Sequence, residues 1–383
     1  MARQVRHPRD ILLITLGFPP ARGGIQSCLF ERARLASERI VVLAPGIPGA
    51  REFDREQSFP IYRWPAIFGQ TAGIKRLCQL LFPLIIAWRL CQKYDVRRVE
   101  CGQALPFGAV AWCLRLCKRI PYRVWTYGDD IIKPARWRLV RSLLVGILRH
   151  AEAIFAISEF TREHVQALGI PAQTIQIIYP PLAPVHSLSP DALQAGSTPT
   201  ILTVARLEDR KGIHHIIEML PALCHTYPDL LYIIAGDGPA KPKLESLARQ
   251  FNVAKHVQFT GNVSNTQVAS LYASCDLFVM LPTPAEEKGE VEGLGMVYLE
   301  AAAHGRPAVA WDTGGVAEAV IDMQTGRVVE KDDLMAAQTA IQTLLGDSVL
   351  REKLGRGAQR WAAKMQQRSA QAIQSLDNDH EPS

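Results

Sequence analysis

The chain alternates short apolar runs with helical patterns twice, once on each side of a proline-rich stretch. Continuous apolar runs such as residues 11–15 and 39–43 are typical of strands that are buried on both faces of a parallel sheet. Strands that alternate with helices build βαβ units, in which the helices cover both faces of the sheet. The alternation over residues 11–179, and again from residue 200, therefore predicts two Rossmann-like α/β domains that face a central cleft.

We expect four segments along the 383 residues, a length that accommodates two domains of ordinary size. The prolines that precede residue 200, together with Ser, Gly and Ala, are typical of a linker. The expected segments are an N-terminal domain over 1–185, a linker over 186–199, a C-terminal domain over 200–360, and a helix with a polar tail over 361–383 that can pack back on the first domain.

Charge divides the chain into two halves of opposite sign. Residues 1–186 contain 26 Lys and Arg against 13 Asp and Glu, a balance of +13, whereas the remainder contains 17 against 24, a balance of −7. A basic half favours an anionic membrane, a nucleic acid or a phosphorylated substrate as its partner. Because the sequence has no zinc-finger spacing, RRM motif or basic heptad array, nucleic acid is the weakest of the three.

Hydropathy and cysteine usage indicate the cellular compartment in which the protein is expected. The longest apolar run, residues 80–88, contains Pro83 and is too short to span a bilayer as a helix. The residues before 11 lack the apolar core of a signal peptide. The eight cysteines include no C-x-x-C pair, which favours reduced thiols over disulfides or a metal site. We therefore expect a cytoplasmic protein.

The candidate site is expected in the loops that follow strands, because open parallel sheets bind ligands beyond the carboxyl ends of their strands. The apolar run 276–281 is followed by a loop with Glu292 and by a helical pattern over 294–304 that contains Glu300 and ends at Gly305. Eight residues of helix separate two groups by roughly 12 Å, too far for the paired carboxylates of most glycoside hydrolases. The spacing suits hydrogen bonds to the sugar and ribose of a nucleotide sugar, unless one of the two is simply a surface residue.

Two further loops carry groups that suit a diphosphate. Gly23 and Gly24 open a helix, where small residues allow close approach and the helix start offers free N–H groups. Arg206 follows a strand and Lys211 precedes a helix, so both cations can reach one anion. The alternatives are a tight turn for the glycines and solvated surface charges for the cations.

Two post-strand turns complete the set. Gly236 and Gly238 follow the strand expected over 230–235, and glycine permits close approach of a flat ring or a ribose. Asn262 and Val263 follow the next strand. Each turn is also of a common kind that needs no ligand.

The segment from Glu292 to Ala310, followed by Gly314-Gly315, resembles the E-x7-E signature of the retaining glycosyltransferase family 4. Within the family, Phe-Pro-Pro with Gly-Gly-Ile-Gln and Val-Glu-Gly-Leu-Gly make the chain most similar to the phosphatidylinositol mannosyltransferase-like branch. The resemblance extends, in order, to residues 18–26, 157–161, 204–207 with 210–212, and 235–239.

The resemblance implies the GT-B fold and retaining transfer of a hexosyl group from a nucleotide sugar, with no required metal or other cofactor. It places the donor mainly on the C-terminal domain and a lipid-linked or polysaccharide acceptor on the N-terminal domain, in cell-envelope glycan synthesis. GDP-mannose is the expected donor, and a UDP-sugar is the alternative. A GT-B epimerase or phosphorylase is a further alternative, whereas the missing G-x-G-x-x-G argues against a dinucleotide oxidoreductase.

The resemblance also assigns roles to single residues. Glu292 would contact the donor sugar and Glu300 the ribose, while Arg206 and Lys211 would neutralise the diphosphate. Preorganised cations and N–H groups stabilise the charge that a leaving diphosphate develops. With no dedicated base in the pattern, the departing phosphate oxygen can take the acceptor proton. The backbone N–H groups expected to add to these cations are those of Gly24, Leu294, Gly295 and Met296.

One loop departs from the family pattern. Many relatives carry a His at the end of the strand expected over 122–126, where this chain has Tyr127. A tyrosine hydroxyl can donate a hydrogen bond to the donor sugar but does not become a cation at neutral pH. We expect Tyr127 to belong to the catalytic site and Asp129 or Asp130 to contact the acceptor.

Basic side chains flank apolar helical surface in the first half, a pattern that suits an anionic membrane. We therefore expect peripheral association with the inner face of the cytoplasmic membrane; the alternative is ordinary solvated helix faces around a core. The basic residues concerned are Lys75, Arg76, Arg89, Lys93, Arg136, Arg138, Arg141 and Arg149.

Overall fold

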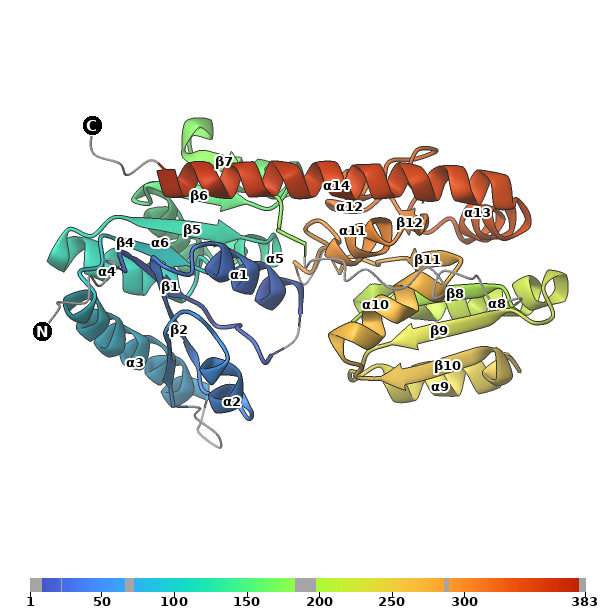
Figure 1. The fold of residues 1–383 in the computed structure, drawn as a ribbon, viewed down its shortest axis with the longest axis horizontal. Helices are drawn as coiled ribbons and strands as arrows, with labels where there is room; N and C mark the ends of the chain where they lie inside the picture. The colour runs from blue at the N-terminus through green and yellow to red at the C-terminus, as the bar shows by residue number, and fades with distance from the viewer. Residues whose placement is uncertain (1–8, 22, 66–71, 183–197, 286–288, 379–383) are drawn as a thin grey trace, which may run out of the picture. The chain divides into compact units, whose positions relative to one another are not determined.

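The computed structural model describes residues 9–21, 23–65, 72–182, 198–285 and 289–378. The chain divides into two compact units, one made of Met1–Ala183 with Arg368–Ser383 and the other of Pro184–Gln367. Each unit is an α/β structure built on one parallel sheet, as the alternating pattern predicts (Figure 1). Most of the linker expected over 186–199 lies outside the described residues.

The sheet of the first unit has the strand order β3-β2-β1-β4-β5-β6-β7, and all its neighbouring strands are parallel. Strand β1 pairs with β2 on one side and β4 on the other, so that Ile11 lies between Ile40 and Arg98. The strands are β1 (Ile11–Ile14), β2 (Ile40–Pro45), β3 (Ile61–Trp64), β4 (Arg98–Cys101), β5 (Tyr122–Thr126), β6 (Ala153–Ala156) and β7 (Ile175–Ile177).

The helices of the first unit follow these strands in sequence. Pro83 lies inside α3 without ending it, and Ser158 caps α7 as expected by accepting a hydrogen bond from the Thr161 N–H. The helices are α1 (Gly24–Leu35), α2 (Ala50–Arg55), α3 (Ala72–Lys93), α4 (Phe107–Lys118), α5 (Asp129–Ala135), α6 (Arg138–Arg149) and α7 (Glu159–Gln166), with a 3-10 turn at Ala172–Thr174.

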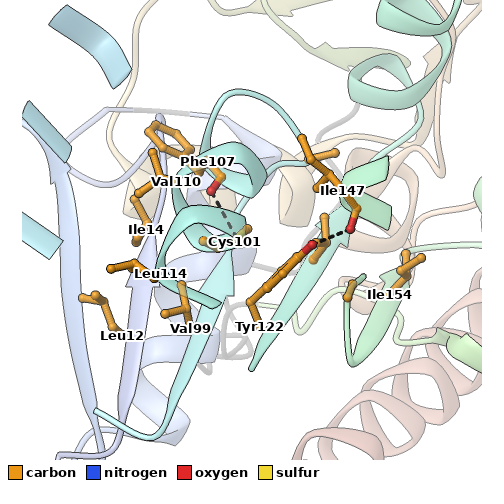
Figure 2. Close-up of a cluster of buried hydrophobic side chains, with 14 of the residues drawn as sticks. Leu12, Ile14, Val99, Cys101, Phe107, Val110, Leu114, Tyr122, Ile147 and Ile154 are labelled. Atoms are coloured by element: carbon orange, nitrogen blue, oxygen red, sulfur yellow. Dashed lines mark hydrogen bonds between the residues drawn. The ribbon is translucent and has the colours of Figure 1, made fainter. Parts of the chain in front are cut away.

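One face of this sheet packs against α3, α4 and α6 to form the main core of the unit. Leu12, Val99 and Ile147 are among the side chains that lose all contact with solvent there (Figure 2). Buried polar atoms in this core find backbone partners. The Tyr122 hydroxyl donates to the Ile147 carbonyl at 2.5 Å, and the Cys101 thiol faces the Phe107 carbonyl at 3.6 Å.

The other face of β4 and β5 carries a buried charge cluster. The Glu100 carboxylate accepts hydrogen bonds from the Arg32 guanidinium at 2.7 Å and from the Trp125 indole at 3.1 Å. Burial alone would raise the pKa of Glu100, but Arg32 holds it below its ordinary value. Arg123 on the same strand donates to the carbonyl of Leu376, which lies near the end of the last helix.

The sheet of the second unit has the strand order β10-β9-β8-β11-β12-β13, again parallel throughout. The strand run expected over 276–281 is confirmed as a fully buried strand in the centre of this sheet. The strands are β8 (Thr200–Val204), β9 (Leu231–Ala235), β10 (Val257–Gly261), β11 (Leu277–Met280), β12 (Ala308–Trp311) and β13 (Gly326–Val329).

The helices of the second unit begin and end where the local signals place them. Ser264 starts α10 with a capping box completed by Gln267, and Gly305 follows the end of α11 in the left-handed region. The helices are α8 (Ile213–Thr226), α9 (Lys241–Gln250), α10 (Asn265–Ser274), α11 (Met296–Ala303), α12 (Val316–Ala319), α13 (Leu334–Gly346) and α14 (Ser348–Asn378), with 3-10 turns at Asp209–Lys211 and Ala254–His256. From Arg368 on, α14 belongs to the first unit.

Among the residues that the structure describes, no helix combines the length and the apolar character that crossing a membrane requires.

Candidate functional site

The strand order of the second sheet reverses between β8 and β11. From β8 the chain proceeds outward to β9 and β10, and it then returns to place β11 on the other side of β8. The loops after β8 and β11 therefore leave the sheet in opposite directions and form the crevice in which open α/β sheets bind ligands. Lys211 follows β8 and Glu292 follows β11, so the fold brings these two predicted residues to one place.

Lys211 and Glu292 form an ion pair at this point. The Lys211 Nζ donates to Glu292 Oε2 at 2.6 Å, and the two side chains are only 13% and 15% exposed. Burial would raise the pKa of Glu292, but the charge and hydrogen bond of Lys211 hold this pKa below its ordinary value. Glu292 is therefore a carboxylate at neutral pH.

Two arginines near this pair differ in placement. Arg206, which we expected at the diphosphate, has a side chain that is 73% exposed and lies 3.3 Å from a Glu208 oxygen. Arg210 is 24% exposed, donates to Glu208 at 2.9 Å, and is the second cation that lowers the pKa of Glu292. Arg210 was present in the family motif, but the sequence did not show that the 3-10 turn at Asp209–Lys211 sets it beside the carboxylate.

Close backbone contacts fix the two loops against each other. The Thr283 N–H donates to the Arg210 carbonyl at 2.9 Å. Gly212 has φ of +66°, and a Cβ there would lie 1.6 Å from the Leu281 carbonyl oxygen. Only glycine allows this approach, which holds the turn that carries Lys211 against the end of β11.

The loop after β12 supports Glu292 from the other side. The Gly315 N–H donates to the Glu292 carbonyl at 2.9 Å, and a Cβ on Gly314 would lie 2.3 Å from the same oxygen. The backbone N–H of Gly295 also bonds to the Glu292 carboxylate. One of the helix-start N–H groups expected to serve the donor is thus engaged by Glu292 in this structure.

At Gly236 and Gly238 the structure requires glycine because of backbone packing, whereas the sequence suggested the close approach of a ligand. A Cβ on Gly236 would lie 1.9 Å from the Ala205 carbonyl oxygen, and one on Gly238 would lie 2.4 Å from that of Leu207. These glycines therefore let the loop after β9 pack against the loop that carries Arg206. Contact with a ring or a ribose stays a prediction.

Glu300 lies in α11, the helix that begins at Met296 after Gly295. Its carboxylate accepts a hydrogen bond from the Tyr272 hydroxyl at 2.9 Å, and burial raises the pKa of Glu300. Tyr272, on α10, was not singled out by the sequence, because nothing in the spacing indicated that α10 packs beside α11.

The remaining predicted donor residues of the second unit are less enclosed or purely apolar. Asn262 is exposed and Val263 half-buried where β10, the edge strand, ends. The Leu294 side chain is 1% exposed, which leaves only its backbone for a ligand.

In the first unit the corresponding reversal lies between β1 and β4. Gly23 caps α1 and Gly24 is the first residue of this helix. The side chain of Gln26 fills the turn, because a Cβ on Gly17 or on Gly23 would lie 2.6 Å or 2.4 Å from its amide atoms. Gln26 belonged to the quoted motif but not to the predicted site residues.

The hydroxyl of Tyr127 faces the interior. The residue is 7% exposed, and its hydroxyl is buried with no hydrogen-bond partner among the described residues. Burial and the neighbouring thiol of Cys28 raise the pKa of Tyr127. The expected hydrogen bond from Tyr127 to the donor sugar stays a prediction, and it requires the side chain to turn outward.

The two acidic residues at the start of α5 are placed differently. Asp130 accepts a hydrogen bond from the Tyr127 N–H at 2.7 Å, and burial raises its pKa to about 6. Asp129 is half-buried and lies 3.4 Å from Lys133. Of the two, Asp129 is the more accessible to an acceptor.

Within the described parts of the chain, no group of three or more His, Cys, Asp or Glu side chains is arranged to hold a metal ion.

Solved structures place this pair of sheets in a known architecture. The chain superposes on HepE from Anabaena, solved in complex with UDP, with a TM-score of 0.80 at 19% identity over 96% of this chain and 99% of the other. Sucrose-phosphate synthase from Thermosynechococcus elongatus gives a TM-score of 0.81 at 18% identity, over 96% and 98%. The fold is GT-B, the architecture of a class of glycosyltransferases.

Sequence comparison gives the family. Residues 22–184 match the family described as Glycosyltransferase Family 4, and residues 188–361 match Glycosyl transferases group 1. The GDP-mannose-dependent alpha-(1-6)-phosphatidylinositol monomannoside mannosyltransferase of Mycolicibacterium smegmatis is 30% identical over 92% of this chain and 93% of its own length. The GDP-mannose-dependent monoacylated alpha-(1-6)-phosphatidylinositol monomannoside mannosyltransferase of Corynebacterium glutamicum is 28% identical over 91% of each chain. The chain belongs to glycosyltransferase family 4 and is a nucleotide-sugar-dependent hexosyltransferase.

Proposed function

We propose that this enzyme transfers a mannosyl group, with retention of anomeric configuration, from GDP-mannose to a lipid-linked acceptor in cell-envelope glycan synthesis. The names of the relatives at 28–30% identity support this donor and a phosphatidylinositol mannoside-like acceptor. The observation that carries the proposal is the ion pair between Lys211 and Glu292 at the strand-order reversal of the second sheet.

Donor binding would break the ion pair between Lys211 and Glu292 and give each of the two residues a new partner on the donor. The diphosphate takes up Lys211, with Arg206 and Arg210 adding positive charge, because phosphate forms strong charge-assisted hydrogen bonds with these groups. Glu292 is then released to accept hydrogen bonds from sugar hydroxyls, and Glu300 accepts from the ribose. These cations stabilise the charge that develops on the leaving diphosphate.

The transfer step needs no protein base. The acceptor oxygen bonds to the anomeric carbon while the bond from that carbon to the phosphate oxygen breaks, and this phosphate oxygen takes the acceptor proton. Glu292, a carboxylate before the donor binds, serves as a hydrogen-bond acceptor in this scheme. Attack from the face that the phosphate leaves retains the configuration.

The first unit offers a surface that suits a lipid acceptor. Apolar side chains on α3 and α6 are exposed, including Ile85 at 50% and Leu139 at 88%, and basic residues such as Arg138 lie among them. Lys118 on α4 lies 4.1 Å from the centre of the exposed Trp88 ring. A basic and apolar helical face binds anionic membranes, so we place the enzyme at the inner face of the cytoplasmic membrane. The side chains of Lys75 and Arg76 lie outside the described residues.

A donor panel tests the proposal. Purified enzyme is incubated with GDP-mannose, GDP-glucose, UDP-glucose and UDP-N-acetylglucosamine in the presence of phosphatidylinositol mannosides, and nucleotide diphosphate release and product lipid are measured. GDP release with a mannosylated lipid product is expected. Release from a UDP-sugar alone would overturn the proposed donor, and transfer only to a soluble glycan would overturn the proposed acceptor.

A further inference from the structure

A small pocket opens in the first unit between α5, α6 and α7. It has a volume of about 260 Å³. Its lining residues belong to these three helices or directly follow α5 and α7. They are named together as the α5–α7 pocket: Ile131, Ile132, Ala135, Arg136, Arg141, His164, Ala167 and Leu168.

The pocket combines an aliphatic lining with positive charge. Five of its lining side chains are aliphatic, two are arginines, and none is acidic. Throughout the parts of the chain that the structure describes, neither Arg136 nor Arg141 has an ion pair or a side-chain hydrogen bond. Both arginines are exposed, so their charge is available to an anion from solution. The complementary ligand is therefore apolar at one end and anionic at the other.

The volume of the pocket and the exposed residues beside it further limit the class of ligand that it can bind. Small-molecule pockets usually occupy roughly 300–1,000 Å³, so this pocket suits a single chain rather than a folded or polycyclic ligand. Trp137 and Leu139, which follow Arg136 in the sequence, are 72% and 88% exposed. Exposed aromatic and aliphatic groups beside arginines are typical of a surface that meets lipid head groups.

The pocket also adjoins the expected acceptor loop. Ile131 and Ile132 belong to α5, whose first residues are Asp129 and Asp130. A ligand anchored in the pocket is thus held by the same short helix that begins at this loop.

The geometry points to the α5–α7 pocket as a binding site for one acyl chain of an anionic phospholipid acceptor, whose phosphodiester pairs with Arg136 and Arg141. The inference rests on the proposed function for the lipid nature of the acceptor. Burial of methylene groups in the aliphatic lining supplies affinity, and the arginines select the anionic head group.

Binding of a soluble phospholipid tests this site in the full-length enzyme. Dioctanoyl phosphatidylinositol is titrated below its micelle-forming concentration and compared with glycerophosphoinositol, which lacks acyl chains. Because each buried methylene contributes about 0.8 kcal/mol, or about fourfold in affinity, the acylated ligand should bind more tightly by several such steps. Equal affinity of the two ligands would overturn the inference.

Matched variants locate the binding. Ala167→Phe fills the pocket, and Gln166→Phe adds the same ring at the preceding residue, which does not line the pocket. Arg136→Glu with Arg141→Glu reverses the pocket charge, and the matched control, Arg249→Glu with Arg360→Glu, reverses two exposed arginines of the second unit. The pocket variants should each lose about tenfold or more in lipid affinity, and the control variants should stay near wild type.

GDP binding, measured on every variant, separates this inference from the proposed function and confirms that the variants are folded. Pocket variants that bind GDP and the dioctanoyl lipid as their controls do would overturn the pocket. A wild-type enzyme that binds the lipid through the pocket but releases no GDP from GDP-mannose would support the pocket and overturn the proposed function.

Discussion

The Lys211 ammonium and the Glu292 carboxylate are 81 positions apart in the chain and 2.6 Å apart in the fold. Each largely buried charge compensates the other, since an unpaired charge in such a place is unfavourable. A donor diphosphate that takes up Lys211 therefore exchanges one ion pair for another and leaves Glu292 to the sugar. The pair is thus both a structural contact and the centre of the proposed donor site.

Asp130 gives a pH-dependent prediction at the same scale. Burial raises its pKa from 3.8 to about 6. A raised carboxyl pKa contributes stability that is present below the unfolded pKa and lost as the pH rises through about 6. Asp130→Asn keeps an oxygen for the Tyr127 N–H and removes the titration. Between about pH 4 and pH 7 the wild type should therefore lose roughly 2 kcal/mol more unfolding free energy than this variant.

Urea unfolding of both proteins at the two pH values measures this difference. Asp95→Asn is the matched control, since the Asp95 side chain is 81% exposed and asparagine also tolerates its positive φ, and it should keep the wild-type pH profile. Parallel profiles for wild type and Asp130→Asn would show that Asp130 does not titrate in this way.

The sequence could identify residue types for the site but not their pairing. Glu292 and Lys211 were both predicted, yet their ion pair depends on β8 and β11 being neighbours, which spacing does not reveal. The sequence could not show which of Arg206 and Arg210 lies nearer Glu292, because the turn after β8 decides how exposed each side chain is. The Tyr127 hydroxyl is buried near Cys28 of α1, and the sequence did not show that these two residues are neighbours in the fold.

At the scale of elements, the packing of two turns sets the site, and Gly212 tests it. Gly212→Ala places a Cβ 1.6 Å from the Leu281 carbonyl oxygen at φ of +66°. Gly261 has the same φ with nothing within 4 Å of a Cβ, so Gly261→Ala isolates the backbone effect, about 1–2 kcal/mol. Gly212→Ala should cost more than this, and it should also reduce turnover by about tenfold or more because Lys211 is displaced.

Denaturant unfolding and turnover with GDP-mannose, measured on both glycine variants, decide the point. Equal destabilisation by the two substitutions would mean that the approach of Gly212 to β11 does not constrain the fold.

Patterning predicts the buried strands and the long helices better than the edges. The runs that became β1, β2 and β11 are continuous and apolar, and each of these strands lies inside its sheet. The edge strands β3 and β13 were missed, because β3 reads Ile-Tyr-Arg-Trp and is mostly half-buried, which weakens the apolar signal. The short helix α5 was missed because it follows β5 closely and contains Pro134.

At the scale of the whole molecule, the +13 balance of residues 1–186 against −7 for the rest predicts which part meets a membrane. The double variant Leu139→Glu with Leu143→Glu removes exposed apolar groups from α6. It should weaken binding to phosphatidylglycerol-containing vesicles by about tenfold or more, since both apolar burial and attraction to anionic lipid are reduced.

Vesicle co-sedimentation at low and high salt measures this binding. Val349→Glu, which changes a residue of the second unit that is 75% exposed, should bind vesicles as the wild type does. Wild-type binding should fall as salt rises, and an unchanged double variant would place the membrane surface elsewhere.

The division of labour between Lys211 and Glu292 is the central claim, and calorimetric binding of GDP and GDP-mannose, with turnover measured alongside, tests it most directly. Lys211→Ala should weaken binding of both ligands by about tenfold or more. Glu292→Gln should leave GDP affinity at or above wild type, because Lys211 no longer has to leave an ion pair. It should also remove the gain that the sugar provides and reduce turnover by roughly 10²–10³-fold. Wild-type affinities and turnover in both variants would contradict the account.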